Sequence, residues 1–184
     1  MSTSRFNRAT VDLDLFTDSY RITGRAGIGV GGIHADLENS SSAFLELEDV
    51  YVSRIHQPGE IVAHYRVGVF RKENIHFIVL QDRRKGLSMG SQHGRSLFTR
   101  GRPQAIFMTV PSFEIRGEVH VEGKLIPREL LVKSMGQFQP VFTATASAST
   151  YPDITYSGDL ILVHKERILS LIHISEPTRP LHIA

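Results

Sequence analysis

The sequence predicts an all-β fold built from two small β domains in tandem, each with one short helix. The first observation is an internal repeat with an offset of 93 residues: residues 20–24 (YRITG) align with 113–117 (FEIRG), and 70–75 (FRKENI) align with 163–168 (VHKERI). Because the two anchors keep one register, a duplication explains them better than chance. The second observation is that short apolar or alternating segments recur between turn signals, which is typical of strands.

The first repeat begins with a strand at Val11–Phe16, where apolar and acidic residues alternate with the period of a half-buried strand. Further elements expected in this repeat are strands at 20–25, 44–52, 61–70 and 75–80 and a helix of one or two turns at 34–39. The last two strands are separated by the polar residues Arg71–Asn74. This arrangement predicts a hairpin.

The second repeat begins with a more continuously apolar strand at Ala105–Val110, which indicates burial on both faces. Its helix is expected to begin at Pro127, a favourable first-turn residue, and to stop at Gly136. The other expected elements are strands at 113–120, 138–147, 155–164 and 168–172, with a turn at 165–167.

Composition excludes several classes of site. The 184-residue chain has no cysteine, which excludes disulfides, thiolate metal ligands and a cysteine nucleophile. No apolar run is longer than four residues, the length of Phe77–Leu80, and such a run is too short to cross a bilayer. Residues 1–8 lack the apolar core of a secretory signal, so we expect a cytoplasmic protein with no membrane span.

The basic charge is concentrated between the repeats. The segment Arg83–Arg102 has six basic residues and no acidic one, and it is rich in glycine and serine, so we expect a flexible linker. The predicted organisation is a disordered N-terminus at 1–9, a first repeat at 10–81, a linker at 82–103, a second repeat at 104–172 and a tail at 173–184. From about Leu169 onward the sequence resembles a translated sequencing adapter, so we interpret the tail as artefactual or disordered.

No motif indicates catalysis, a metal or a cofactor. Gly27–Gly32 fits G-x-G-x-x-G, with Asp49 at a suitable distance for a ribose contact. Barely six helical residues follow, however, so a surface loop explains the glycines better than a dinucleotide site. The run Arg83–Lys85 is typical of cyclic-dinucleotide receptors, but their second signature is absent. We therefore expect a protein that is not an enzyme.

The hairpin segment 69–78 (VFRKENIHFI) resembles the second signature of the Sm-like proteins, and 22–24 with 44–50 resembles the two ends of their first signature. Lys72 and Lys165 stand where that family has a turn glycine, and a longer insertion follows Gly24. The chain is also similar to uncharacterised bacterial families of small duplicated barrels. The resemblance implies two tandem Sm-like or SH3-like barrels; one β-sandwich built from both repeats is the alternative.

In Sm-like proteins the arginine and asparagine of this turn hold an RNA base. By motif, the resemblance points to Arg71 and Asn74 with Lys72 between them, and to Asp36 and Asn39 as weaker loop equivalents. The chemistry is reasonable, because arginine stacks on a base plane and asparagine reads a base edge. The alternative is a polar, solvent-exposed turn.

The linker supplies the other candidate contacts to nucleic acid, through phosphate attraction that weakens as salt rises. Its basic residues are Arg83, Arg84, Lys85, Arg95, Arg100 and Arg102. The sequence thus favours a non-enzymatic module that binds RNA. The alternative is a protein-interaction or assembly module in which an open strand edge, such as Ile61–Phe70, pairs with another chain. Whether the protein forms a homo-oligomer stays open.

Overall fold

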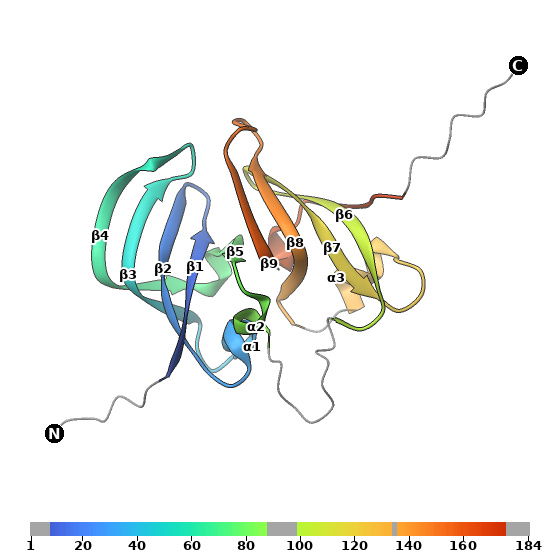
Figure 1. Ribbon diagram of the computed structural model, residues 1–184, viewed down its shortest axis with the longest axis horizontal. Helices are drawn as coiled ribbons and strands as arrows, with labels where there is room; N and C mark the ends of the chain where they lie inside the picture. Colours follow the sequence, from blue (N-terminus) through green and yellow to red (C-terminus); the bar gives the residue numbers. More distant parts are fainter. Residues whose placement is uncertain (1–7, 88–98, 134–135, 176–184) are drawn as a thin grey trace, which may run out of the picture.

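The computed structural model describes residues 8–87, 99–133 and 136–175 and is mostly β, as the sequence predicts (Figure 1). The strands of the first half are β1 (Ala9–Phe16), β2 (Tyr20–Ile28), β3 (Phe44–Arg54), β4 (Gln57–Arg71) and β5 (Phe77–Leu80). Those of the second half are β6 (Arg102–Val110), β7 (Phe113–Val121), β8 (Phe138–Ala148), β9 (Thr155–His164) and β10 (Ser170–His173). The helices are α1 (Gly32–Glu38), α2 (Arg83–Gly86) and α3 (Pro127–Lys133), and single 3₁₀ turns follow β4 (Lys72–Asn74) and β9 (Lys165–Arg167).

All ten strands belong to one antiparallel sheet in the order β10-β6-β7-β8-β9-β5-β1-β2-β3-β4. The prediction of two closed barrels is therefore wrong, and the described residues do not form a sandwich of two separate sheets either. The physical reason is the position of β5. To close the first half into a barrel, β5 would have to pair with β4, but it pairs with β9 of the second half instead.

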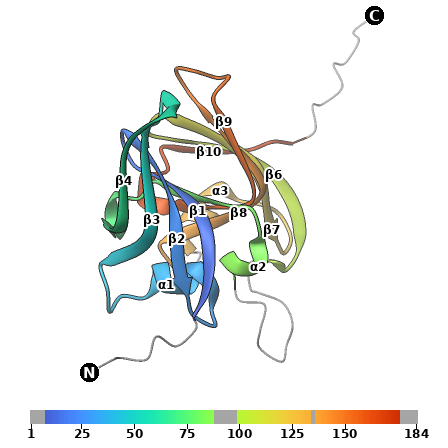
Figure 2. The same cartoon turned by 60° about the vertical axis from the view of Figure 1, so that its left-hand side comes forward.

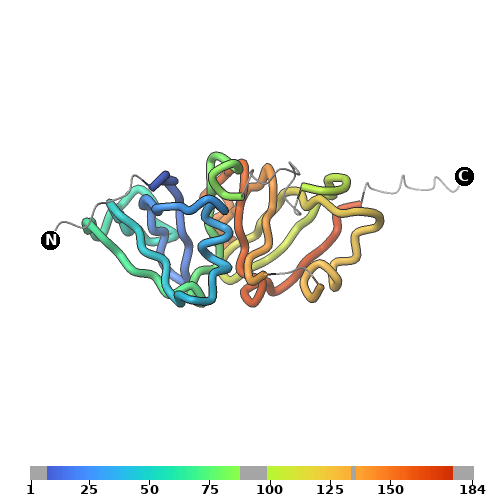
Figure 3. The backbone as a smooth tube through the Cα atoms, turned by 90° about the horizontal axis from the view of Figure 1, so that it is seen from below, coloured from blue at the N-terminus to red at the C-terminus, as the bar shows by residue number. Residues whose placement is uncertain are grey.

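The two halves repeat each other element by element. Each of β1, β2 and β5 begins 93 residues before its counterpart β6, β7 and β10, and β3 begins 94 before β8. Gly24 and Gly117 both lie where the pairing register to the next strand shifts. Seen from below, the halves lie side by side along the length of the molecule (Figure 3).

The strands β5 and β9 join the halves, and we call their contact the β5–β9 seam. Phe77 pairs with Val163 and Leu80 with Leu160, and the amide of His164 donates to the carbonyl of His76 at 2.9 Å. Every residue of β5 is buried, and so are the residues of β9 that face it. The seam is thus interior structure rather than a loose contact between domains.

Two hydrophobic clusters form the core, and each includes residues from both halves. The cluster of the first half includes Phe138, Phe142, Leu160 and Leu162 from β8 and β9. The cluster of the second half includes Phe16, Phe77 and Val79 from β1 and β5. Because each half completes the core of the other, we expect them to fold as one unit.

The start of the expected flexible linker is ordered. Residues 83–86 form α2, which lies beside α1 (Figure 2), and Leu87 is buried. The sequence argument failed here because the anchor is remote: the Arg83 guanidinium pairs with Asp159, 76 positions along the chain. The rest of that prediction falls partly on residues 88–98, which lie outside the described residues, and β6 begins at Arg102.

Candidate functional site

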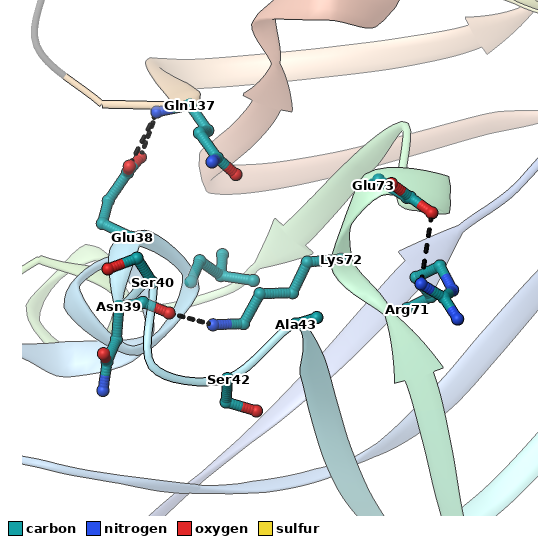
Figure 4. A pocket seen from close by; sticks show the side chains of 10 residues that line it. Glu38, Asn39, Ser40, Ser42, Ala43, Arg71, Lys72, Glu73 and Gln137 are labelled. Carbon is teal, nitrogen blue, oxygen red and sulfur yellow. Dashed lines mark hydrogen bonds and ion pairs between the residues drawn. The ribbon is translucent and has the colours of Figure 1, made fainter.

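A small depression lies where the loop after α1 meets the turn after β4 (Figure 4). Its volume is about 220 Å³, and one of its residues, Gln137, comes from the second half. The lining residues are Leu37, Glu38, Asn39, Ser40, Ser42, Ala43, Arg71, Lys72, Glu73 and Gln137. The structure thus gathers Asn39, Arg71 and Lys72 of the predicted RNA site around one depression.

Lys72 links the turn after β4 to α1 and to the loop that follows it through hydrogen bonds. Its ammonium donates to the carbonyl oxygens of Asp36 at 2.6 Å and Asn39 at 2.9 Å, and its own amide donates to Ala43. The residue is 5% exposed, and burial lowers the pKa of its ammonium. A lysine at this place satisfies carbonyls at the end of α1. Its ammonium is therefore engaged by the protein itself.

Arg71 lies on the rim of the depression with half of its side chain exposed. The guanidinium carbon stands 5.0 Å from the centre of the Phe44 ring, a cation–π arrangement, and Nη1 lies 3.5 Å from the Glu73 carboxylate. Asn39 Oδ1 accepts from the amide of Ser41. Arg71 is thus the residue of the predicted set that is best placed to meet a ligand.

The other two predicted turn and loop residues lie differently. Asn74 is exposed but does not line the depression. The Asp36 carboxylate accepts from the amide of Gly29 at 3.2 Å, in the loop before α1, and only its carbonyl reaches Lys72. The structure therefore does not gather all five residues around the depression.

Glu38 is a residue that sequence reasoning missed. Its carboxylate accepts from the amides of Gln137, at 2.7 and 2.8 Å, and Phe138, at 2.8 Å. Beside it, His34 Nε2 lies 3.2 Å from the Phe138 carbonyl, and burial lowers the pKa of this imidazole. No sequence signal could have identified Glu38, because its partners are about a hundred positions away and meet it only through the packing of the halves.

The first linker arginines are matched by carboxylates. Arg83 Nε lies 3.0 and 2.9 Å from the two Asp159 oxygens, and this hydrogen-bonded pairing raises the pKa of the guanidinium. Arg84 pairs with Asp82 in the same way, which raises its pKa. Lys85, Arg100 and Arg102 are exposed, and Arg95 lies outside the described residues. The basic segment is thus less available to phosphates than its composition indicates.

The free edge of β4 is the second candidate surface. This strand of 15 residues pairs with β3 and stands at one end of the sheet order, and β10 stands at the other. Its side chains Ile61, Tyr65, Val67 and Val69 are 59%, 62%, 48% and 60% exposed. A long exposed apolar edge is unusual, because proteins commonly protect such edges from pairing with other chains.

Among the residues that the structure describes, no group of three or more His, Cys, Asp or Glu side chains is arranged to hold a metal ion. Within the same residues, none of the helices has the length and apolar character needed to span a bilayer. Compared with protein-family models, with curated proteins and with solved structures, the chain matches none of them. The site must therefore be interpreted from its own chemistry.

Proposed function

We propose that this chain is a non-enzymatic binding module that takes up a strand of another polypeptide along the free edge of β4. The observation that carries the proposal is a contrast between equivalent strands. The edge of β9 is covered by β5, whereas the corresponding edge of β4 is free in the described structure and bears exposed apolar side chains.

The hydrogen-bonding groups of this edge follow from the pairing of β4 with β3. The Lys72 amide donates to the Ala43 carbonyl, and Phe70 and Gly68 lie opposite Leu45 and Leu47. In an antiparallel ladder, alternate residues bond to opposite sides. The N–H and C=O groups of Val67 and Val69 therefore point to the free edge, where an added strand would meet them.

A peptide test follows from the β5–β9 seam. A fluorescent peptide with the sequence of residues 74–82 carries β5, which pairs with the β9 edge within the chain. Because β4 is the strand equivalent to β9, the same peptide should pair with the free edge of β4. It should bind the full chain saturably, as measured by fluorescence anisotropy, and a scrambled peptide should not. Val69→Pro should abolish binding, because proline lacks the N–H that faces the free edge but leaves the bonds to β3 intact.

The matched control is Val69→Ala, which shortens the same side chain and keeps its amide. This variant should retain binding, and both variants should keep the far-ultraviolet circular dichroism of the original chain. If the proline variant binds the peptide as well as the alanine variant does, strand addition at β4 is ruled out.

Binding of a single-stranded RNA base at Arg71 is a second candidate, supported by the exposed guanidinium over Phe44 and by the depression that Arg71 and Asn39 both line. It rests on the resemblance of the turn to Sm-like proteins. A base would stack on the guanidinium face and meet the asparagine amide with its edge. The exposed Lys85, Arg100 and Arg102 would add phosphate contacts.

A filter-binding assay with generic single-stranded RNA at low and moderate salt tests this candidate. Arg71→Ala should weaken binding by about tenfold if a stacked base is lost. Arg66→Ala is the matched control, because Arg66 is an exposed arginine of the same strand that does not line the depression. Equal affinities for the two variants would remove the RNA candidate.

A further inference from the structure

We propose that the strand taken up by β4 is β10 of a second copy of this chain, so that copies join head to tail. The inference rests on the proposed function and names its partner. The repeat supplies the argument: β4 is the counterpart of β9, and β10 is the counterpart of β5. A contact between β10 of one copy and β4 of the next would therefore repeat the β5–β9 seam between molecules.

The internal seam fixes the register of the contact. Ile78 pairs with Leu162 and Leu80 with Leu160. Moved by the repeat offset of 93, these pairs become Leu171 opposite Val69 and His173 opposite Val67. Val67 and Val69 are the residues whose amides point to the free edge, so the hydrogen-bonding pattern of the seam is preserved as well.

Exposed apolar side chains mark both ends of the sheet. Leu160 and Leu162 are fully buried in the seam, but their counterparts Val67 and Val69 are 48% and 60% exposed. On the other side, Val79 is 2% exposed and its counterpart Ile172 is 53% exposed. Pairing of the two edges would remove apolar surface from water at both ends, which stabilises the contact.

These two edges hold a large share of such surface. Of the fifteen large apolar side chains that are exposed in the described residues, eight lie on the edges, five in β4 and three in or beside β10. β10 lies within the segment that resembles a translated adapter, but strand addition is made mainly by main-chain groups. The proposal therefore depends on the free edge of β10 more than on its side chains.

The contact would join two different surfaces. Such a heterologous interface leaves one free β4 edge and one free β10 edge at the ends of every open assembly, so growth continues until a ring closes or a filament forms. Pairing of β4 with β4 would instead stop at a dimer. This difference allows the two arrangements to be separated by experiment.

Disulfide trapping is the test, because the chain has no cysteine and any introduced thiol is unique. Val69→Cys and Leu171→Cys are made as separate full-length proteins and oxidised alone and as a mixture. Residues opposite each other in a hydrogen-bonded antiparallel pair have Cα atoms about 5.5 Å apart, within the range for a disulfide. The mixture should give about tenfold more disulfide-linked dimer than either protein alone.

Ile61→Cys mixed with Leu171→Cys is the matched control. Ile61 is 59% exposed against 60% for Val69, but it lies eight residues along the same strand, about 26 Å away. This mixture should remain at the level of the single proteins. Sedimentation of the original chain should show mass rising with concentration beyond a dimer, and Val69→Pro should remain monomeric where Val69→Ala does not.

Three results would overturn the inference. Equal trapping in the Val69→Cys and Ile61→Cys mixtures would show that the disulfides form by chance collision. Efficient dimer formation by Val69→Cys alone would show pairing of β4 with β4. A monomer at all concentrations in sedimentation would show that the chain does not self-associate. In each case the peptide assay decides the proposed function separately. Binding of the 74–82 peptide that is sensitive to Val69→Pro would leave strand uptake standing with a different partner.

Discussion

Lys72 and Lys165 hold equivalent positions in the two halves, one residue after β4 and β9. Each ammonium reaches back to the segment that precedes the neighbouring strand: Lys72 to the carbonyls of Asp36 in α1 and Asn39 after it, and Lys165 to the carbonyl of Gly136 at 2.6 Å. Burial is the main cause that lowers the pKa of both lysines. In each half, the lysine that stands in place of the Sm-like turn glycine thus donates hydrogen bonds to the backbone of the preceding segment.

Lys72→Ala should lower the free energy of unfolding by about 1–3 kcal/mol, because it removes two hydrogen bonds from a charged donor. Urea unfolding followed by circular dichroism measures the change. Glu73→Ala is the control: its side chain is 65% exposed, and the change should stay within about 0.5 kcal/mol. Equal losses of stability for the two substitutions would contradict a stabilising role for the Lys72 hydrogen bonds.

His34, His76 and His164, which are buried in the described structure, should make stability depend on pH. Burial is the main cause that lowers the pKa values of His34, His76 and His164 below the ordinary value. In the unfolded chain these side chains take up protons near pH 6.5, about the ordinary histidine pKa. The folded state resists protonation, so stability is fully present above that pH and is lost as the pH falls below it.

The urea midpoint should therefore be lower at about pH 5.5 than at about pH 7.5. His76→Gln should reduce this difference, since it removes one of the three groups. His76 Nε2 lies 3.1 Å from the Asp18 carboxylate, which favours protonation of the ring, whereas nearby Arg167 opposes it. Both charges therefore influence the size of the effect of His76→Gln. A midpoint that is unchanged or higher at the acidic pH would contradict the prediction.

At the scale of elements, each half contains the same β-bulge. Gly24 and Gly117 lie at the register shifts, and Asp49 and Thr143 on the partner strands have φ angles of 50° and 45°. A Cβ on Gly117 would come within 2.7 Å of Val141 Cγ1. The glycine gives the partner strand room to approach, and the bulge increases the local twist of the sheet.

Thr143→Asn should raise the free energy of unfolding by about 0.5–1 kcal/mol, because asparagine tolerates a positive φ better than a β-branched residue does. Thr143 is exposed, so little packing is lost. The same change at Thr155, an exposed strand residue that does not have a positive φ, should give no gain. Chemical denaturation of both variants provides the comparison, and a loss at Thr143 would argue against strain there.

The strands were predictable because their signals are local. The pattern at residues 155–164 gives β9 with its observed bounds, and the repeat locates its counterpart β4, although the structure extends β4 to Gln57–Arg71. The barrel prediction failed because the sequence does not say which strand β5 pairs with. α2 was missed for a related reason, since Arg83 finds Asp159 only after folding.

The sequence motif identified some residues of the candidate site but not how they are packed. The motif located Arg71 and Asn39, which do line one depression. It could not show that the Lys72 ammonium bonds within the protein or that Asn74 does not line the depression, because these facts depend on how the loop after α1 packs. An open strand edge at Ile61–Phe70 was anticipated, and this segment lies in β4, but the partner that we propose for the edge is suggested only by the internal seam.

At the scale of the whole molecule, the halves share their cores, so the chain should unfold in one transition. Leu162 of β9 is fully buried in the cluster of the first half. Leu162→Ala should lower stability by about 2–5 kcal/mol and shift one calorimetric transition as a whole. Val132→Ala, at a side chain that is 74% exposed, should leave it in place. Two separate transitions would show that the halves are independent.

The central proposal is that the two unlike free edges of one sheet pair between copies of the chain, and amide hydrogen exchange tests it most directly. At low protein concentration the amides of Val67 and Val69 should exchange rapidly, because they have no partner strand on that side. As concentration rises, these two amides should become protected. The amide of Ile61, which lies outside the residues that β10 would face, should not. Unchanged exchange at Val67 and Val69 at every concentration would contradict the account.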